Sequence, residues 1–383
     1  IRDSYRNPEK YNCSKRPRAA KMIDFTITET QKMIIESLEN NFSKKTDIRL
    51  LNEKAEGDNE YKYGYEEVSK LGFLGMITSE ELDGFGLDFV DFSIFMEKWG
   101  SFLCNGPIIN NIVSGIFALQ SIDEKRFSKL IKDLSISKRI ITSSIAQQYE
   151  SKEFIQIINK DQSFFLNGSI TNIEFFDEAT DITIIGMLDN QLKLLILPKK
   201  NISISQEKKS LIGDKIVDLE LSDHLIEKDL IVDLNNSEKL IEQIFNLTNL
   251  ALCSESIGIC QSILDKTLDY LINRDAFGKK IGTFQSIQHK CAEIYIYINE
   301  VRELIRNAFK NINNEDFSRL ASMSKIKSDL ELDKITWISH QLHGAIGFTW
   351  DYGLHLYTKK ILINKSLGGD LNFHSTKLYP DGN

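Results

Sequence analysis

The chain has 383 residues, of which 42% are hydrophobic and 27% charged, as in globular proteins with room for two or three domains. Its net charge of −8 argues against general nucleic-acid binding, and no apolar run is long enough to predict a transmembrane segment. Five scattered cysteines indicate reduced thiols, and hence a cytoplasmic protein with an organellar matrix as the alternative. No Cys or His pair has metal-ligand spacing, so no metal site is expected.

The first 21 residues hold seven lysines and arginines and little that could enter a core. We interpret residues 1–21 as an extension or a disordered arm. Residues 22–138 are predicted to form an N-terminal helical domain, because their apolar residues recur at helical spacing. Helices are expected from Thr28 onward, over residues 65–71, from Phe89 through Met96 and around residues 109–119.

The middle of the chain has a different period. Short apolar runs alternate with Asn, Asp, Gly and Lys, as in FIQII, SFFLNG, ATDITIIGML, LKLLILP, DLEL and LIVDL. These runs predict a middle domain over residues 139–236 that is an antiparallel β-barrel or sandwich. From Ser237 the helical spacing returns, and residues 237–383 are predicted to pack as a helical bundle. The fold class expected from periodicity is therefore α+β, with one β domain between two helical ones.

A basic, glycine-punctuated stretch, RDAFGKKIGTFQSIQH, lies between two long helical patterns. Arg274, Lys279 and Lys280 bring positive charge to it, and Thr283 can cap the helix that follows. A helix N-terminus flanked by basic residues is suited to binding a phosphate group. The alternative is an ordinary helix–turn–helix connection with surface charge.

The order R-x-x-F-G-x-x-I-G-x-F-Q from Arg274 to Gln285 resembles the signature of the acyl-CoA dehydrogenase family. A second stretch, QLHGAIGFTW over residues 341–350, is similar to the second C-terminal motif of that family. The resemblance implies an N-terminal helical domain, a middle β domain and a C-terminal four-helix bundle. It also implies an oligomer that oxidises an acyl-CoA substrate with FAD and passes electrons to an electron-transfer flavoprotein.

In the family, part of each FAD site comes from the neighbouring subunit. The residues of this chain that match those positions are Arg274, Phe277, Gln285, Gln341, Gly344 and Gly347. The resemblance therefore implies that this chain contacts the pyrophosphate and adenosine portions of an FAD held by another subunit.

The carboxylate base of the family is not found at either of its usual positions. Those positions fall on Thr248, early in the first bundle helix, and on Gly368, after the second motif. Neither residue can remove a proton as a carboxylate does. The remaining candidates for a catalytic base are weak ones: Glu255, Asp351 and Asp370.

The part of the flavin site that the family builds within one subunit also differs. The segment that corresponds to a flavin-binding loop, residues 145–150, lacks the expected motif and is short. In the following strand, Asn172 stands where the family has a tryptophan that packs on the flavin, and Glu174 replaces a hydroxyl. A negative charge there would oppose the electron-rich reduced flavin.

Three hypotheses remain from the sequence. The first is a subunit of a heteromeric acyl-CoA dehydrogenase that lacks its own catalytic glutamate and completes the FAD site of a dehydrogenase-like partner chain. The second is an autonomous homo-oligomeric enzyme with a relocated carboxylate base. The third is a structural or interaction protein that has kept the fold without the flavin.

Overall fold

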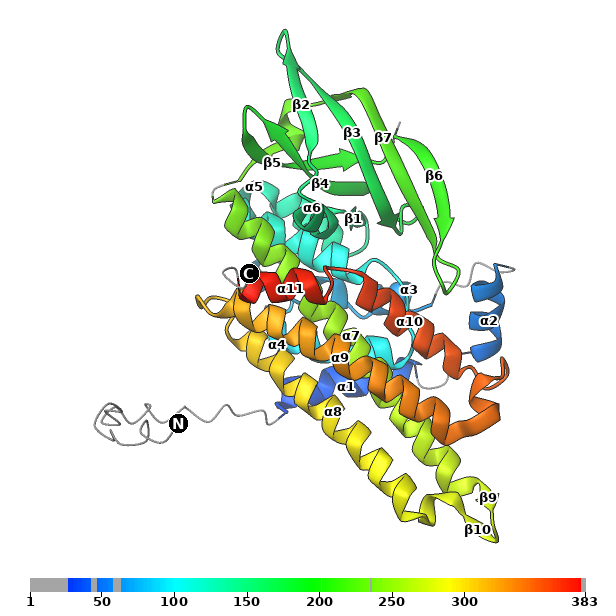
Figure 1. The fold of residues 1–383 in the computed structure, drawn as a ribbon. Helices are drawn as coiled ribbons and strands as arrows, with labels where there is room; N and C mark the ends of the chain where they lie inside the picture. The colour runs from blue at the N-terminus through cyan, green and yellow to red at the C-terminus, as the bar shows by residue number, and fades with distance from the viewer. Residues whose placement is uncertain (1–26, 43–46, 58–62, 201, 235, 380–383) are drawn as a thin grey trace, which may run out of the picture.

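The computed structural model describes residues 27–42, 47–57, 63–200, 202–234 and 236–379. The expected N-terminal extension, residues 1–21, lies outside the described residues. Two helical regions precede and follow a β-sheet in the chain, and in space they lie together while the sheet projects from one end of the molecule (Figure 1). The expected α+β fold class, with a β layer between helical regions, is confirmed. No helix within the described ranges is long and apolar enough to cross a membrane.

The N-terminal helices form where the sequence provides caps and apolar faces. Asp88 begins α4 with a capping box: its side chain accepts hydrogen bonds from backbone N–H groups of the first turn, and the side chain of Asp91 accepts one from the backbone N–H of Asp88. Asp47 caps a short helix, α2, that periodicity did not predict. The elements are α1 (Glu29–Phe42), α2 (Ile48–Glu56), α3 (Tyr65–Lys70), α4 (Phe89–Ser101), the π-helix η4 (Asn110–Phe117) and α5 (Ala118–Ser135).

The middle region is an eight-stranded sheet with strand order β6-β7-β3-β2-β4-β5-β8, in which β1 pairs with β4. Most pairs are antiparallel, but β4 pairs in parallel with both β1 and β2. Apolar residues from β2, β3 and β7 share one core with those of β4 and β5, as in a sandwich. The strands are β1 (Ile141–Ser143), β2 (Ile155–Lys160), β3 (Ser163–Glu174), β4 (Asp181–Leu188), β5 (Gln191–Pro198), β6 (Ser203–Lys209), β7 (Lys215–Ile226) and β8 (Ile231–Asp233).

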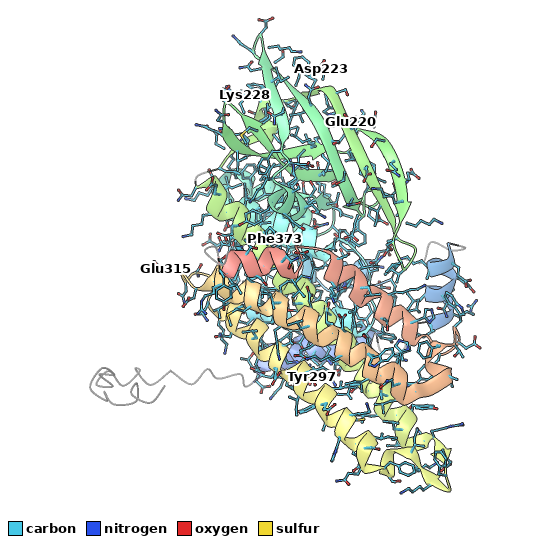
Figure 2. All side chains as sticks on the ribbon, in the orientation of Figure 1. Glu220, Asp223, Lys228, Tyr297, Glu315 and Phe373 are labelled. Atoms are coloured by element: carbon cyan, nitrogen blue, oxygen red, sulfur yellow. The ribbon has the colours of Figure 1, made fainter. Side chains whose placement is uncertain are left out.

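The outer part of this sheet carries charged side chains into solvent, among them Glu220 and Asp223 of β7, and the exposed Lys228 lies just beyond that strand (Figure 2). Between β1 and β2 the chain forms a seven-residue helix, α6 (Ile145–Ser151). This is the segment that corresponds to a flavin-binding loop in the family, and its helical form was not anticipated from the sequence.

The C-terminal region is a bundle of long helices, with the shorter α11 packed on α9. A short β-hairpin between α7 and α8 caps one end, far from the sheet (Figure 1). The elements are α7 (Ser237–Asn273), β9 (Asp275–Ala276), β10 (Lys279–Lys280), α8 (Gln285–Lys310), α9 (Phe317–His343), α10 (Leu354–Ser366) and α11 (Leu371–Leu378).

Two glycines bring α4 and α7 into close contact. A Cβ atom on Gly258 of α7 would overlap the carbonyl of Glu97, and one on Gly100 of α4 would overlap the carbonyl of Glu255. The backbones therefore touch where any larger residue would push the helices apart. This crossing fixes α4, and with it the N-terminal helices, on the bundle.

Candidate functional site

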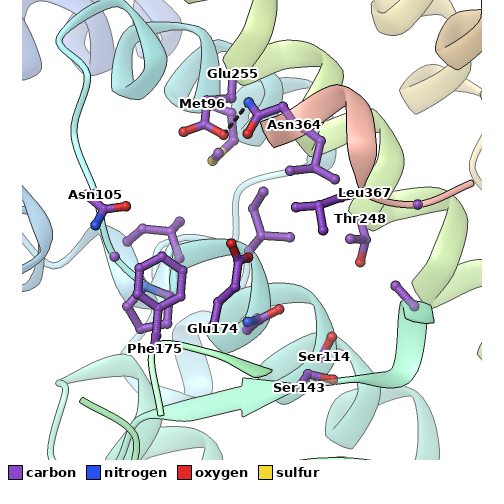
Figure 3. Close-up of a pocket in the computed structure, with 18 of the residues that line it drawn as sticks. Met96, Asn105, Ser114, Ser143, Glu174, Phe175, Thr248, Glu255, Asn364 and Leu367 are labelled. Atoms are coloured by element: carbon purple, nitrogen blue, oxygen red, sulfur yellow. Dashed lines mark hydrogen bonds between the residues drawn. The ribbon is translucent and has the colours of Figure 1, made fainter. Parts of the chain in front are cut away.

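A small enclosed pocket lies where the N-terminal helices, the sheet and the bundle meet (Figure 3). Its walls come from α4, η4, α6, the end of β3, α7 and α10. The cavity volume is about 60 Å³, whereas small-molecule sites usually enclose roughly 300–1,000 Å³. The pocket is therefore closed around its polar side chains rather than open to a large ligand.

Both positions that the family uses for a carboxylate base line this pocket. The hydroxyl of Thr248 is buried and has no hydrogen-bond partner among the described residues. Gly368 has φ +75°, and a Cβ atom there would overlap the side-chain amide of Asn249. A carboxylate could not occupy position 368 unless Asn249 moved. The structure therefore brings Thr248 and Gly368 to one cavity, and neither residue supplies a carboxylate there.

Of the three weak candidates for a base, only Glu255 lines the pocket. Its carboxylate is 3% exposed, accepts a 2.8 Å hydrogen bond from Asn364 Nδ2 and lies 3.4 Å from Lys360 Nζ. Asp370 caps α11 by accepting a 2.7 Å hydrogen bond from a backbone N–H, and Asp351 is exposed beyond the end of α9. Neither of these two carboxylates belongs to the pocket lining.

Glu174, at the end of β3, points its carboxyl group into the pocket toward Glu255 and Asn364 (Figure 3). Burial raises the pKa of Glu174 to about 7, although Lys360 opposes this shift. Burial also disfavours charge on Lys360, but nearby carboxylates, Glu255 foremost, outweigh it and raise the pKa of that amine. The pocket is thus an electrostatically coupled group of one ammonium and two carboxyls.

The helix α6 contains residues 145–150, which the sequence resemblance assigns to a flavin-binding loop. Gln148 fixes it to β4, because its side-chain amide both accepts from and donates to the backbone of Ile185, at 2.7 and 2.9 Å. Tyr149 packs on Phe245 of α7, with ring centroids 4.6 Å apart. These tertiary contacts hold a short helix that would be marginal by itself.

The pocket does not fit a flavin ring held by this chain. Its volume is small, and the carboxyl of Glu174 faces the cavity. Asn172, which lies within β3 where the resemblance implies a tryptophan, is exposed and does not line the pocket. The residues expected within one subunit are thus absent or replaced, and no chemical step is assigned to a flavin in this pocket.

The residues expected to contact a neighbour's FAD lie at the other end of the bundle, around the β9–β10 hairpin (Figure 1). Arg274, Gln285 and Gln341 are exposed, and Phe277 is 93% exposed. Among the ion pairs that the described residues form, none involves Arg274. A Cβ atom on Gly344 would meet nothing within 4 Å.

The two C-terminal motifs are joined in space by stacked rings. Tyr270, one turn before Arg274, lies with its ring centroid 4.9 Å from that of His343, which precedes Gly344. The His343 ring also lies 2.8 Å from the hydroxyl of Tyr352. The exposed groups of the two motifs are a guanidinium, side-chain amides, an aromatic ring and an open glycine backbone. These groups fit the phosphate and adenosine portions of a dinucleotide.

Gly347 has a different setting from Gly344. It is buried, and a Cβ atom there would lie 2.8 Å from the Cβ of His343. Its glycine is required for packing within this chain, whatever ligand the adjacent surface contacts.

Sequence reasoning did not find Lys360 or Asn364, which hold Glu255. Their spacing of four residues places both on one face of α10, but a Lys and an Asn at that spacing are ordinary on a helix surface. Only the packing of α10 against α7 reveals that this face is turned toward buried carboxylates.

Family comparison matches both helical regions. Residues 28–124 match the acyl-CoA dehydrogenase N-terminal domain, and residues 239–378 match the acyl-CoA dehydrogenase C-terminal domain. The caffeyl-CoA reductase-Etf complex subunit CarC of Acetobacterium woodii is 23% identical over 85% of this chain and 91% of that protein. The mitochondrial short-chain specific acyl-CoA dehydrogenase of Bos taurus is 23% identical over 77% of this chain and 76% of that protein.

Solved structures share the fold at low sequence identity. A glutaryl-coenzyme A dehydrogenase in complex with glutaryl-CoA matches with a TM-score of 0.82 and 20% identity, over 94% of this chain and 96% of that one. A chain of the ChsE4-ChsE5 complex from Mycobacterium tuberculosis matches with a TM-score of 0.83 and 16% identity, over 94% and 98%. Because the two domain matches together span more than half of its length, the chain belongs to the acyl-CoA dehydrogenase family.

Proposed function

We propose that this protein is a subunit of a heteromeric, FAD-dependent acyl-CoA dehydrogenase that completes the flavin site of a catalytic partner chain. The observation that carries the proposal is the contrast between two ends of the molecule. At the inter-domain pocket, both base positions lack a carboxylate and the cavity is about 60 Å³. At the hairpin end, the residues that resemble the family's contacts across subunits are present, and all of them except Gly347 are exposed.

The surface around the hairpin also supports assembly with another chain. More than half of the described large apolar side chains that are exposed fall between residues 268 and 350. Such a concentration is typical of a protein–protein interface rather than of a solvated face. The side chains are Leu268, Ile272, Phe277, Tyr295, Ile296, Leu330, Trp337, Ile346, Phe348 and Trp350.

In the proposed complex, the guanidinium of Arg274 faces the pyrophosphate of the partner's FAD, and Gln285 and Gln341 donate hydrogen bonds to it and to the adenosine portion. The open backbone at Gly344 lets the nucleotide approach closely. When bound, FAD accepts a hydride equivalent from the acyl-CoA substrate. The partner supplies the base, and electrons leave to an electron-transfer flavoprotein. CarC, one of the relatives, is by name a subunit of a complex with Etf.

The test is the visible absorption of the purified chain, alone and after co-expression with a dehydrogenase-like partner. The proposal expects a colourless chain that joins a yellow complex. Arg274→Ala should lower the flavin content of that complex by about tenfold or more, since a charge-assisted contact to phosphate is lost. Arg319→Ala, at the opposite end of α9, is the matched control and should leave the flavin in place. A chain that is yellow by itself would contradict the proposal.

One observation favours a second candidate, an autonomous homo-oligomeric dehydrogenase. Glu255 lies in the same cavity as both family base positions. In that case Glu255→Gln would abolish turnover of an acyl-CoA by the pure chain while its FAD stayed bound. Unchanged turnover in this variant would exclude Glu255 as the base.

A further inference from the structure

The inter-domain pocket contains buried polar side-chain atoms that have no hydrogen-bond partner among the described residues. The Nδ2 atom of Asn364 donates to Glu255 at 2.8 Å, which fixes the orientation of the amide and leaves its Oδ1 as the free atom. That Oδ1 is buried and has no partner in the described part of the chain, and Asn364 is only 1% exposed. The hydroxyl of Thr248, a residue that is 9% exposed, is likewise buried without a partner. Buried polar atoms of this kind are rare unless a ligand or water satisfies them.

The pocket also has an excess of negative charge. Its carboxyl groups are Glu174 and Glu255, and Asp214 lies close enough to influence both Glu174 and Lys360. The opposing ammonium groups are Lys360, 3.4 Å from Glu255, and Lys54, which is paired with Asp214. When every group is ionised, three carboxylates therefore face two ammoniums. One further positive charge would neutralise the group, and a proton on Glu174 is the alternative.

We propose that this pocket binds a small ammonium group, a free ammonium ion or the head of a short primary amine, between the carboxylate of Glu174 and Oδ1 of Asn364. An ammonium group supplies three or more N–H donors and one positive charge, which are the two things that the pocket lacks. The cavity of about 60 Å³ exceeds the roughly 10–15 Å³ that one water molecule needs on the same measure, so it has room for a small head group. A tetraalkylammonium ion carries no N–H donor and cannot satisfy Oδ1 of Asn364.

The site couples cation binding to proton release. Burial raises the pKa of Glu174 to about 7, so near neutrality this carboxyl is partly protonated when the pocket is empty. A bound ammonium favours the carboxylate and displaces the proton. Binding should weaken by about tenfold for each pH unit below 7, because only the ionised form of Glu174 takes the cation.

The experiment uses the whole chain alone, so its outcome is independent of the shared flavin. Thermal denaturation is followed with increasing methylammonium chloride, and with tetramethylammonium chloride or KCl at equal ionic strength. The expected result is a rise in Tm with methylammonium at pH 8 that is small at pH 5.5 and absent with the other two salts. Calorimetry at pH 7, in buffers of different ionisation enthalpy, should show release of a fraction of a proton per bound cation.

Glu174→Gln keeps the size of the side chain and removes its charge, so it should fold and should weaken methylammonium binding at least tenfold. Glu220→Gln, on the exposed side of β7, is the matched control and should bind as the unaltered chain does. Three results would overturn the proposal. Methylammonium and KCl could raise Tm equally, or neither salt could raise it, which would mean that water alone fills the pocket. The third is that Glu174→Gln keeps the full Tm response to methylammonium.

Discussion

The titration of Glu174 predicts a specific change in stability with pH. Below about pH 4.5 this carboxyl is protonated in both the folded and the unfolded chain. Between 4.5 and about 7 the unfolded chain ionises while the folded chain keeps its proton, because burial holds the pKa of Glu174 near 7. The folded state is therefore favoured at low pH, and that advantage is lost as the pH rises through 7.

The magnitude follows from the two pKa values. A rise from 4.5 to about 7, at about 1.4 kcal/mol per pKa unit, makes the ionised carboxyl cost the folded state roughly 3 kcal/mol. Glu174→Gln removes this cost. The variant and the parent chain should thus have similar free energies of unfolding at pH 4.5. At pH 8 the free energy of unfolding of the variant should be higher by up to about 3 kcal/mol.

The assay is urea denaturation of both chains at several pH values, in a buffer without amines or ammonium salts. The difference in free energy of unfolding is taken from the midpoints at a common slope. Glu220→Gln, whose side chain is exposed, should show no such dependence. If the parent and Glu174→Gln curves run parallel from pH 4.5 to 8, Glu174 is not the buried group described above, and the reasoning fails.

Three further predictions concern packing, the buried ion pair and assembly. Gly258→Ala should lower the free energy of unfolding by at least about 1–3 kcal/mol, because its methyl group overlaps a backbone carbonyl of α4. Gly115→Ala should cost less, because its Cβ would lie 3.2 Å from the nearest side-chain carbon and 3.6 Å from the nearest backbone atom that it meets. Equal denaturation midpoints for the two variants would contradict this. Lys360→Met leaves the carboxylate of Glu255 buried without its ammonium partner, so it should destabilise the chain at pH 8 by about 3–5 kcal/mol. Adding Glu255→Gln to this variant should recover most of that loss. A double variant that is no more stable than Lys360→Met would refute the pairing. Trp337→Glu, on the exposed face of α9, should reduce the mass of the oligomer in light scattering, and an unchanged mass would place the interface elsewhere.

The long elements could be predicted from the sequence because each carries its own periodic signal. The helices α7 and α8 span several turns with apolar residues at helical spacing, and most of the strands are apolar runs between turn residues. The strand β6 was missed because its sequence, SISQEKK, is polar and mostly exposed. This strand forms because its backbone hydrogen-bonds to the edge of β7, and the local sequence contains no sign of that pairing.

In the candidate site too, the residues marked by the local sequence could be predicted, whereas those that matter through contacts with distant segments could not. Glu174 was identified as an unusual charge on its strand, and Thr248 and Gly368 as the substituted base positions. Lys360 was not found, because its significance depends on carboxylates contributed by β3 and α7. Likewise, α6 is stabilised by Gln148 bonding to β4, a contact between segments that are separated in the sequence.

The glycine crossing between α4 and α7 has a consequence for how ligands enter the pocket. Met96 and Trp99 of α4 share one wall with Leu252 and Glu255 of α7, and interlocked backbones prevent these two helices from sliding past each other. That wall is rigid. The opposite wall is formed by the end of β3 and by α6, both of which belong to the segment between α5 and α7. Any widening of the cavity must therefore come from walls other than this crossing, and the end of β3 and α6 are two of them.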